Sequence, residues 1–299
     1  MILIAGITVV ATLSVMSGLS KGVKLLSELN LIISGVLLAV VLLVGPTTYI
    51  LSTYLPSLGV YITDFASTGL FTAILPEDVA WQGEWSVFYW AWWISWSPFV
   101  GTFIARISKG RTIKEIALGV LIIPPVTITF AMTILGAAGI FVNEQFGGVI
   151  EQAVETNIAT SMFEMFNYLT SSGLLQSILS VTGVIAIAIF FVTSSDSGSL
   201  VASSLTSGGL QEPPVAQRVF WSVLQGLIAM AVLLVGGEAA LTTIQSAVII
   251  LGFPFAIMLL MIIFSLNKEL QGSYRKYSYN KNLSLKKRLQ KIKDTAEYQ

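Results

Sequence analysis

The chain has 299 residues, of which 55% are hydrophobic and only 11% charged, with a formal net charge of zero and a mean hydropathy of +0.82. A soluble domain carries about 25% charged residues, so this composition excludes an ordinary soluble enzyme and predicts an all-α integral membrane protein. Because the sequence contains neither Cys nor His, it also excludes a histidine metal centre, a thiol nucleophile and a histidine proton relay. We therefore expect no enzyme activity, no catalytic residue and no bound organic cofactor.

Seven segments are long and apolar enough to cross a bilayer, which takes about 20 residues in a helix. In chain order they are residues 1–19, 31–51, 86–105, 113–142, 174–201, 219–235 and 241–264. The first has no basic residues before it and no cleavage site after it, so we interpret it as a span and not as a signal peptide. Since a multispan protein rarely starts directly with a span, we expect that a preceding segment is missing.

The basic residues lie on alternate connections between these segments. All 16 Lys and Arg fall after the first, third and seventh spans or between the fifth and sixth, whereas the other connections carry acids and no base. Lys and Arg near span ends favour the cytoplasm. This pattern predicts a multi-pass protein of the cell membrane with its C-terminus in the cytoplasm.

Two further stretches differ in composition from the spans. Residues 56–85 mix Tyr61, Phe65 and Phe71 with polar residues, which predicts an amphipathic segment at the outer membrane surface. The tail, residues 266–299, alternates Leu and Ile with a basic cluster, which is Lys286, Lys287, Arg288, Lys291 and Lys293. This tail is either an ordinary solvated segment or a regulatory helix that binds anionic lipid.

Six of the seven Trp residues lie in or just before the third span, at positions 81, 85, 90, 92, 93 and 96. The outer ones are typical of an aromatic belt at the membrane surface. Trp92 and Trp96 fall near the midplane on one helical face, with Trp93 adjoining, and Pro98 predicts an interruption of this helix. Aromatic faces attract quaternary ammonium groups, so these indoles predict a cation site; the alternative is a cluster that faces lipid.

The fifth span carries hydroxyl groups at helical spacing. Phe190, Thr193, Ser194 and Ser197 recur on one face, and oxygen ligands of this kind suit a hard cation such as sodium. The alternative is that the hydroxyls bond the backbone one turn back or join neighbouring helices. Asp196 lies off this face, and we expect it to have a structural partner, such as an Arg between the third and fourth spans.

Two motifs make the sequence similar to a known family. Residues 88–112 (FYWAWWISWSPFVGTFIARISKGRT) and 190–201 (FFVTSSDSGSLV) resemble the betaine/carnitine/choline transporter family, and Gly18, Lys21, Gly22 and the Gly-Pro-Thr triplet at 45–47 also match. The similarity extends along nearly the whole chain, and it is closest to the glycine betaine transporters of that family. The chain resembles their C-terminal portion.

The resemblance implies a fold of twelve spans that contains two inverted five-helix repeats, as in the leucine transporter. On that comparison, residues 1–55 form the last two helices of the first repeat and 56–85 the outer amphipathic segment. Residues 86–265 form the complete second repeat, and 266–299 the cytoplasmic tail. The family also implies a homotrimer, and nothing in it suggests a nucleic-acid partner.

The resemblance also implies roles for individual residues. Trp92, Trp93 and Trp96 match the positions that surround trimethylammonium, Phe190, Thr193 and Ser194 match one sodium site, and Phe99 matches a position associated with a second. The run Ser95, Trp96, Pro98 and Phe99 is that of sodium-coupled betaine transporters. We therefore expect sodium symport of glycine betaine, with choline or carnitine as alternative substrates. Exchange without sodium and proton coupling stay open as alternatives.

The other broken helix of the family and its partner residues have no counterpart in the chain, so half of each implied site is missing. This motivates an alternative of another class, a membrane fragment or subunit that does not transport. A pore is disfavoured because no ring of charge or filter-like loop is visible. An intramembrane enzyme is disfavoured because only one acid lies within a span.

Overall fold

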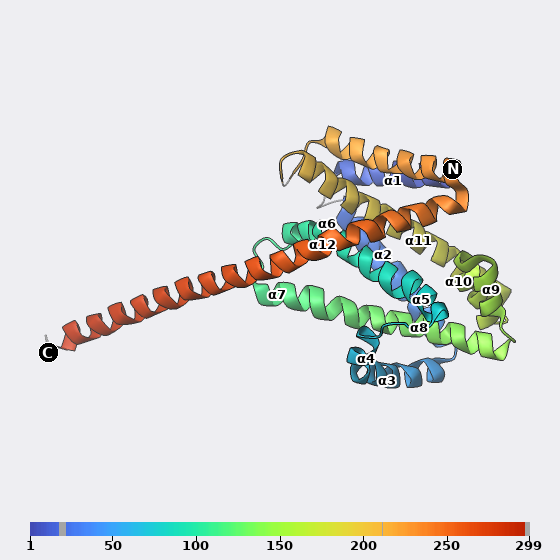
Figure 1. Cartoon of the computed structure of the whole chain (residues 1–299), viewed down its shortest axis with the longest axis horizontal. Helices are drawn as coiled ribbons and strands as arrows, with labels where there is room; N and C mark the ends of the chain where they lie inside the picture. Colours follow the sequence, from blue (N-terminus) through green and yellow to red (C-terminus); the bar gives the residue numbers. More distant parts are fainter. Residues whose placement is uncertain (18–21, 211, 297–299) are drawn as a thin grey trace. The chain divides into compact units, whose positions relative to one another are not determined.

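A computed structural model describes residues 1–17, 22–210 and 212–296, with the backbone alone for 238–242 and 287–296. Every regular element in these residues is helical (Figure 1). The elements are α1 (Ile2–Ser17), α2 (Lys24–Val44), α3 (Thr47–Thr63), α4 (Phe65–Gly69), α5 (Pro76–Gln82), the π-helix η2 (Gly83–Val87), α6 (Phe88–Ile107), α7 (Ile113–Ala117), the π-helix η3 (Leu118–Ile122), α8 (Ile123–Gln145), α9 (Val149–Asn157), the 3-10 helix η4 (Ile158–Thr160), α10 (Ser161–Leu169), α11 (Gly173–Thr206) and α12 (Val215–Ala296). The prediction of an all-α membrane protein agrees with this helical content.

Five helical stretches in the described residues are long and apolar enough to cross a membrane, fewer than the seven spans predicted. They are Lys24–Val44, Ile113–Gln145, Gly173–Thr206, Val215–Gly237 and Thr243–Lys286. The other two predicted spans are also helices. However, α1 has only 16 residues, and α6 is not among the five although it has 20. Helix α6 contains four Trp and one Tyr, and the polar atom in each of these rings lowers its mean hydropathy.

The second predicted span is displaced in the structure, because a helix end lies inside it. Helix α2 ends at Val44, and Gly45 adopts an extended conformation with φ −78° and ψ −166°. Pro46 cannot donate an amide hydrogen bond, and Thr47 Oγ1 instead donates to the carbonyl of Leu42 at 2.5 Å. The chain continues as α3, so the Gly-Pro-Thr triplet separates two helices.

Helix α12 consists of two helices that meet at a kink. Gly237 has φ 50° and ψ −130°, which no residue with a β-carbon adopts readily. The second stretch, Thr243–Lys286, extends well beyond the predicted end of the seventh span. The change of composition near residue 266 therefore does not end the helix.

The chain divides into two compact units, and each is described by itself. Unit 1 comprises residues 1–72 and 99–241, and unit 2 comprises 73–98 and the chain from 242 onward. In unit 1, α11 packs along both α1 and α2, and α8 packs against α2, α3 and α10. Its core contains Leu37, Val41, Ile50, Ile134, Ala137, Ala138, Val142, Met165, Phe166 and Leu179. These apolar contacts hold the helix that carries the predicted ion ligands.

Candidate functional site

The three predicted substrate-binding indoles lie on α6, within unit 2. Trp92, Trp93 and Trp96 are exposed by 41, 65 and 44% of their surface. Trp92 continues a row of rings, with its centroid 5.6 Å from that of Phe88 and 5.9 Å from that of Tyr89. These indoles therefore present open ring surface, and neighbouring aromatic side chains support one of them.

The predicted interruption of this helix at Pro98 is wrong, because α6 is continuous through the proline. Proline removes the amide that would bond the carbonyl of Ile94, four residues earlier. Ser97 Oγ donates to that same carbonyl at 2.6 Å, and so replaces the missing donor. The irregularity lies further toward the N-terminus, where the π-helix η2 (Gly83–Val87) leads directly into α6.

The part of α6 that belongs to unit 2, residues 88–98, makes a close contact with the second part of α12. Ala91 is the buried residue of α6, and it lies opposite Gly252. A β-carbon on Gly252 would come within 2.9 Å of both Cα and Cβ of Ala91. The small residues allow the backbones to approach closely, which is typical of helix pairs in membranes. This contact determines which face of α6 is left open.

The predicted sodium ligands lie on α11, within unit 1. Thr193 Oγ1 donates to the carbonyl of Phe190 at 3.0 Å, and Ser197 Oγ donates to the carbonyl of Thr193 at 2.9 Å. These two hydroxyls thus make the backbone bonds that the alternative interpretation describes. Ser194 is exposed, and its hydroxyl makes no hydrogen bond to any described residue. The Phe190 ring is 52% exposed.

Phe99, the candidate for a second sodium site, follows Pro98 on α6 but belongs to unit 1. Phe190, Thr193 and Ser194 belong to the same unit, whereas the three indoles belong to unit 2. The substrate candidates and Phe99 thus lie on α6, and the candidates for the first sodium site lie on α11.

The expected Arg partner of Asp196 is a serine instead. Asp196 is completely buried, and Ser14 of α1 donates a hydrogen bond to its Oδ2 atom. Arg218 bonds instead to the residue after Ser14: its Nη1 donates to the carbonyl of Val15 at 2.9 Å. The acid therefore joins α11 to α1. Sequence spacing could not reveal this because the two residues are 182 positions apart.

The sequence analysis did not predict a second set of polar contacts, which join the first part of α12 to α11 and α1. Gln225 of α12 accepts hydrogen bonds from Ser195 at 3.1 Å and from Ser199 at 3.3 Å, both on α11. Thr12 and Ser222 are 3.0 Å apart and join α1 to the first part of α12. The available signal was Gln225 itself, a lone amide in an apolar segment. Such a residue indicates a buried helix contact.

A family model described as BCCT, betaine/carnitine/choline family transporter, matches residues 1–275. The chain belongs to this family. An uncharacterized transporter of Mycobacterium tuberculosis is 43% identical over 267 residues, which are 89% of this chain and 44% of the relative. A glycine betaine/proline/choline transporter of Vibrio parahaemolyticus is 41% identical over 276 residues, which are 92% of this chain and 48% of the relative. A glycine betaine transporter of Acinetobacter baylyi is 41% identical over 272 residues, which are 90% of this chain and 40% of the relative.

The chain spans about half the length of the curated relatives it matches. The match to the betaine/carnitine/choline transporter family nevertheless includes both motifs, on α6 and on α11. The family match ends at residue 275, before the basic cluster of the tail. Lys286 is exposed near the end of α12, whereas Lys287, Arg288, Lys291 and Lys293 lie outside the residues whose side chains are described.

Proposed function

We propose that this chain forms part of a secondary transporter that imports glycine betaine, or a related trimethylammonium compound, by sodium symport. The observation that carries the proposal is the open indole surface of Trp92, Trp93 and Trp96 in a chain of the betaine/carnitine/choline transporter family. Several relatives of this chain are named as glycine betaine transporters, and the proposal extends that substrate class to it.

The chemistry of α6 suits a cation that carries no hydrogen-bond donor. Helix α6 contains no Asp or Glu, so a ligand there would be held by ring faces and not by a carboxylate. A desolvated quaternary ammonium gains about 2 kcal/mol from each good ring face. Three indoles could therefore supply most of the affinity for a trimethylammonium group. Trp96 and Trp92 are one turn apart, which places both rings on one side of the helix.

For the coupling ion we propose the oxygens of Phe190, Thr193 and Ser194. The Thr193 hydroxyl and the Phe190 carbonyl are 3.0 Å apart, so both oxygens could approach one hard cation. The hydroxyl of Ser194 is available as a third ligand, and Phe99 is assigned to a second sodium site. Turning the Thr193 hydroxyl toward an ion costs only one local backbone bond. Sodium would then drive transport by favouring the conformation that binds substrate.

At the level of the whole protein we propose the inverted-repeat fold of the leucine transporter. Residues 86–265 would form the second repeat, and helices of the other repeat would complete the sites on α6 and α11. We further propose a homotrimer in the cell membrane, with the C-terminus in the cytoplasm. The basic residues from Lys286 onward would bind anionic lipid there.

Uptake measurements test the coupling. Radiolabelled glycine betaine is supplied to bacterial cells that lack their own betaine uptake and express the protein from its complete reading frame. We expect uptake that requires an inward sodium gradient and falls to background when the gradient is collapsed. Equal rates with and without sodium would contradict sodium coupling. Uptake that follows a proton gradient or preloaded substrate would favour the family alternatives, and no uptake would favour a non-transporting subunit.

The substrate site is tested by a matched pair of substitutions on α6. Trp96→Leu should weaken uptake affinity about tenfold or more, because one ring face is lost from the cation. Trp90→Leu removes an equally large and more exposed ring, 69% against 44%, from a position that we assign to the aromatic belt. This control should leave affinity near the unmodified value. Equal effects of both substitutions would contradict the assignment of Trp96.

A further inference from the structure

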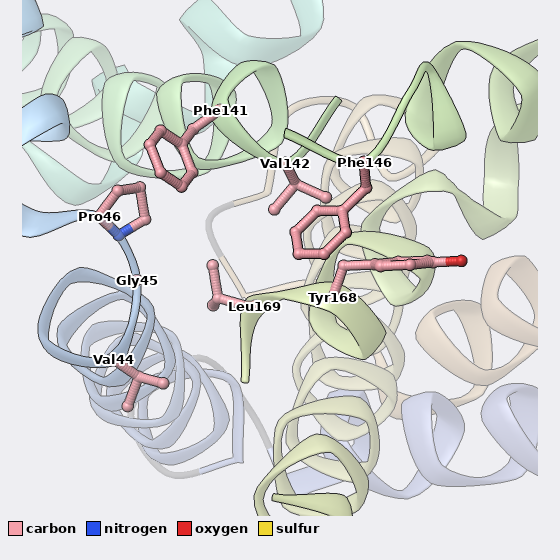
Figure 2. Close-up of a pocket in the computed structure, with 8 residues that line it drawn as sticks. All are labelled: Val44, Gly45, Pro46, Phe141, Val142, Phe146, Tyr168 and Leu169. Carbon is pink, nitrogen blue, oxygen red and sulfur yellow. The ribbon is translucent and has the colours of Figure 1, made fainter. Parts of the chain in front are cut away.

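A pocket of about 250 Å³ lies within unit 1, and none of its lining residues belongs to α6 or α11. Its walls include Val44, Pro46, Phe141, Phe146, Tyr168 and Leu169 (Figure 2). The residues come from the α2–α3 junction, from the end of α8 and from the end of α10. The volume is smaller than the usual range for drug-sized ligands, and it suits one small molecule.

Three helices end at this pocket, and all three present their C-terminal ends. Val44 is the last residue of α2, Phe146 directly follows α8, and Leu169 is the last residue of α10. The last carbonyls of a helix give its C-terminus a partial negative charge, equivalent to about half an elementary charge for a long helix. Helix α8 has 23 residues and contributes fully, whereas the C-terminus of α2 is opposed by the positive N-terminus of α3, which begins at Thr47 directly after Pro46. The C-termini of α8 and α10 leave a net negative partial charge at the pocket, which favours a positively charged ligand.

The side chains of the pocket offer aromatic faces and no acid. The rings of Phe146 and Tyr168 have centroids 5.0 Å apart, and in Figure 2 the Tyr168 hydroxyl points away from the other labelled residues. Phe146 is 48% and Tyr168 is 37% exposed, so neither ring is needed to fill the core. Phe141 lies beside Pro46 and completes the wall (Figure 2). Ring faces bind cations that have no N–H groups to satisfy.

The surrounding sequence adds negative charge and no positive charge. The last turn of α8 carries Glu144, the segment from α8 to α11 carries Glu151, Glu155 and Glu164, and there is no Lys or Arg between Lys114 and Arg218. The α2–α3 junction likewise lies in a stretch without a base, from Leu25 to Ala105. Charge of a single sign around a concave surface concentrates counter-ions there.

We propose that this pocket is a second binding site for a small organic cation, one whose charge carries no hydrogen-bond donor. The C-termini of α8 and α10 supply the negative partial charge, and the rings of Phe146 and Tyr168 supply the contact surface. The site goes beyond the proposed function, because its residues are separate from the substrate residues on α6. A methylated ammonium would bind there, whereas a neutral molecule of the same shape would not.

Binding of tetramethylammonium to the purified full chain tests the proposal. The chain carries W92L/W93L/W96L, so that the indoles of α6 cannot contribute, and calorimetry compares tetramethylammonium with tert-butanol, a neutral molecule of similar shape. We expect saturable binding of tetramethylammonium that is at least about tenfold tighter than that of tert-butanol. No binding of tetramethylammonium, or equal affinity for both compounds, would overturn the proposal. The outcome is independent of whether the indoles bind substrate.

Substitutions in the pocket identify the place of binding. Phe146→Leu and Tyr168→Leu should each weaken tetramethylammonium binding about tenfold, whereas Tyr168→Phe keeps the ring and should leave it unchanged. Since both rings are exposed, these changes should cost little stability, and thermal melting verifies that each variant is folded. Unchanged affinity in both leucine variants would overturn the assignment of this pocket. If a leucine variant fails to fold, the other leucine variant and Tyr168→Phe still test whether ring contact at this pocket is required.

Discussion

Two serines determine how polar groups inside apolar helices are satisfied. Ser97 replaces the amide that Pro98 removes from α6, at a distance of 2.6 Å from the Ile94 carbonyl. Ser14 performs a comparable role for Asp196, which is fully buried on α11. In each case the cost of an unpaired polar group in an apolar environment is avoided by a single hydroxyl. The proline and the acid are visible in the sequence, but the hydrogen bonds made by Ser97 and Ser14 are not.

The bond between Ser14 and Asp196 leads to a prediction about stability. Asp196 Oδ1 has no hydrogen-bond partner among the described residues, so Ser14 is the donor on which the carboxyl depends. Ser14→Ala should lower the free energy of unfolding by about 1–3 kcal/mol, since a buried acceptor loses its donor. Thermal melting of the purified protein in detergent measures this change.

Ser27→Ala is the matched control for this substitution. The Ser27 hydroxyl donates only to the carbonyl of Val23, one turn back on the same helix, at 2.8 Å. Its loss should change stability by less than about 0.5 kcal/mol, the usual range for a site without such a feature. If both alanine variants melted at the same temperature as the unmodified protein, Ser14 would not support the acid.

At the scale of helices, the close contact of Ala91 with Gly252 holds α6 against the second part of α12. A side chain at Gly252 would meet the Ala91 backbone at 2.9 Å, and backbone cannot turn aside as a flexible side chain can. Gly252→Leu should therefore separate the two helices and cost about 1–3 kcal/mol, the range for overpacking. Thermal melting measures the cost. The emission of tryptophan reports on α6 directly, because six of the seven Trp residues lie in or just before it.

Gly272 is the control on the same helix. A β-carbon at Gly272 would have no neighbour within 4 Å, so Gly272→Leu should leave both melting and emission unchanged. An emission spectrum that shifts equally in the two variants would show that a general effect on α12, and not the contact with Ala91, is responsible.

The bounds of several helices could not be predicted from hydrophobicity alone. An apolar run locates a span, but helix ends depend on individual backbone groups. The second span shows this, since α2 ends at Val44 although apolar residues continue to Leu51. The kink at Gly237 is similar, because two adjacent glycines stand in the sequence and only one of them has a positive φ. Tertiary packing determines that Gly237, and not Gly236, adopts the positive φ.

For the whole molecule, the distribution of charge predicts which connections face the cytoplasm. Lys114 lies at the start of the fourth predicted span, beside a basic connection, and Glu155 follows that span on an acidic connection. The chain has no Cys, so a single introduced thiol can be labelled without background. In intact cells, a membrane-impermeant maleimide should label Glu155→Cys and leave Lys114→Cys unlabelled until the cells are permeabilised.

Both positions are exposed in the structure, so neither thiol is hidden by packing. The unmodified chain, which contains no thiol, is the control for non-specific labelling. The reverse pattern, with Lys114→Cys labelled in intact cells and Glu155→Cys protected, would mean that the predicted orientation is wrong.

The sequence by itself determined that this is a helical membrane protein, and the motifs on α6 and α11 identified its family. Composition, apolar runs and local motifs are properties of neighbouring residues, which is why they can be recognised without a structure. The tertiary structure decided that Asp196 bonds to Ser14, that Gln225 joins α12 to α11, and that three helix C-termini meet at one aromatic pocket. Each of these contacts joins residues far apart in the chain, and such pairs are brought together only when helices pack, for which no local pattern carries a signal.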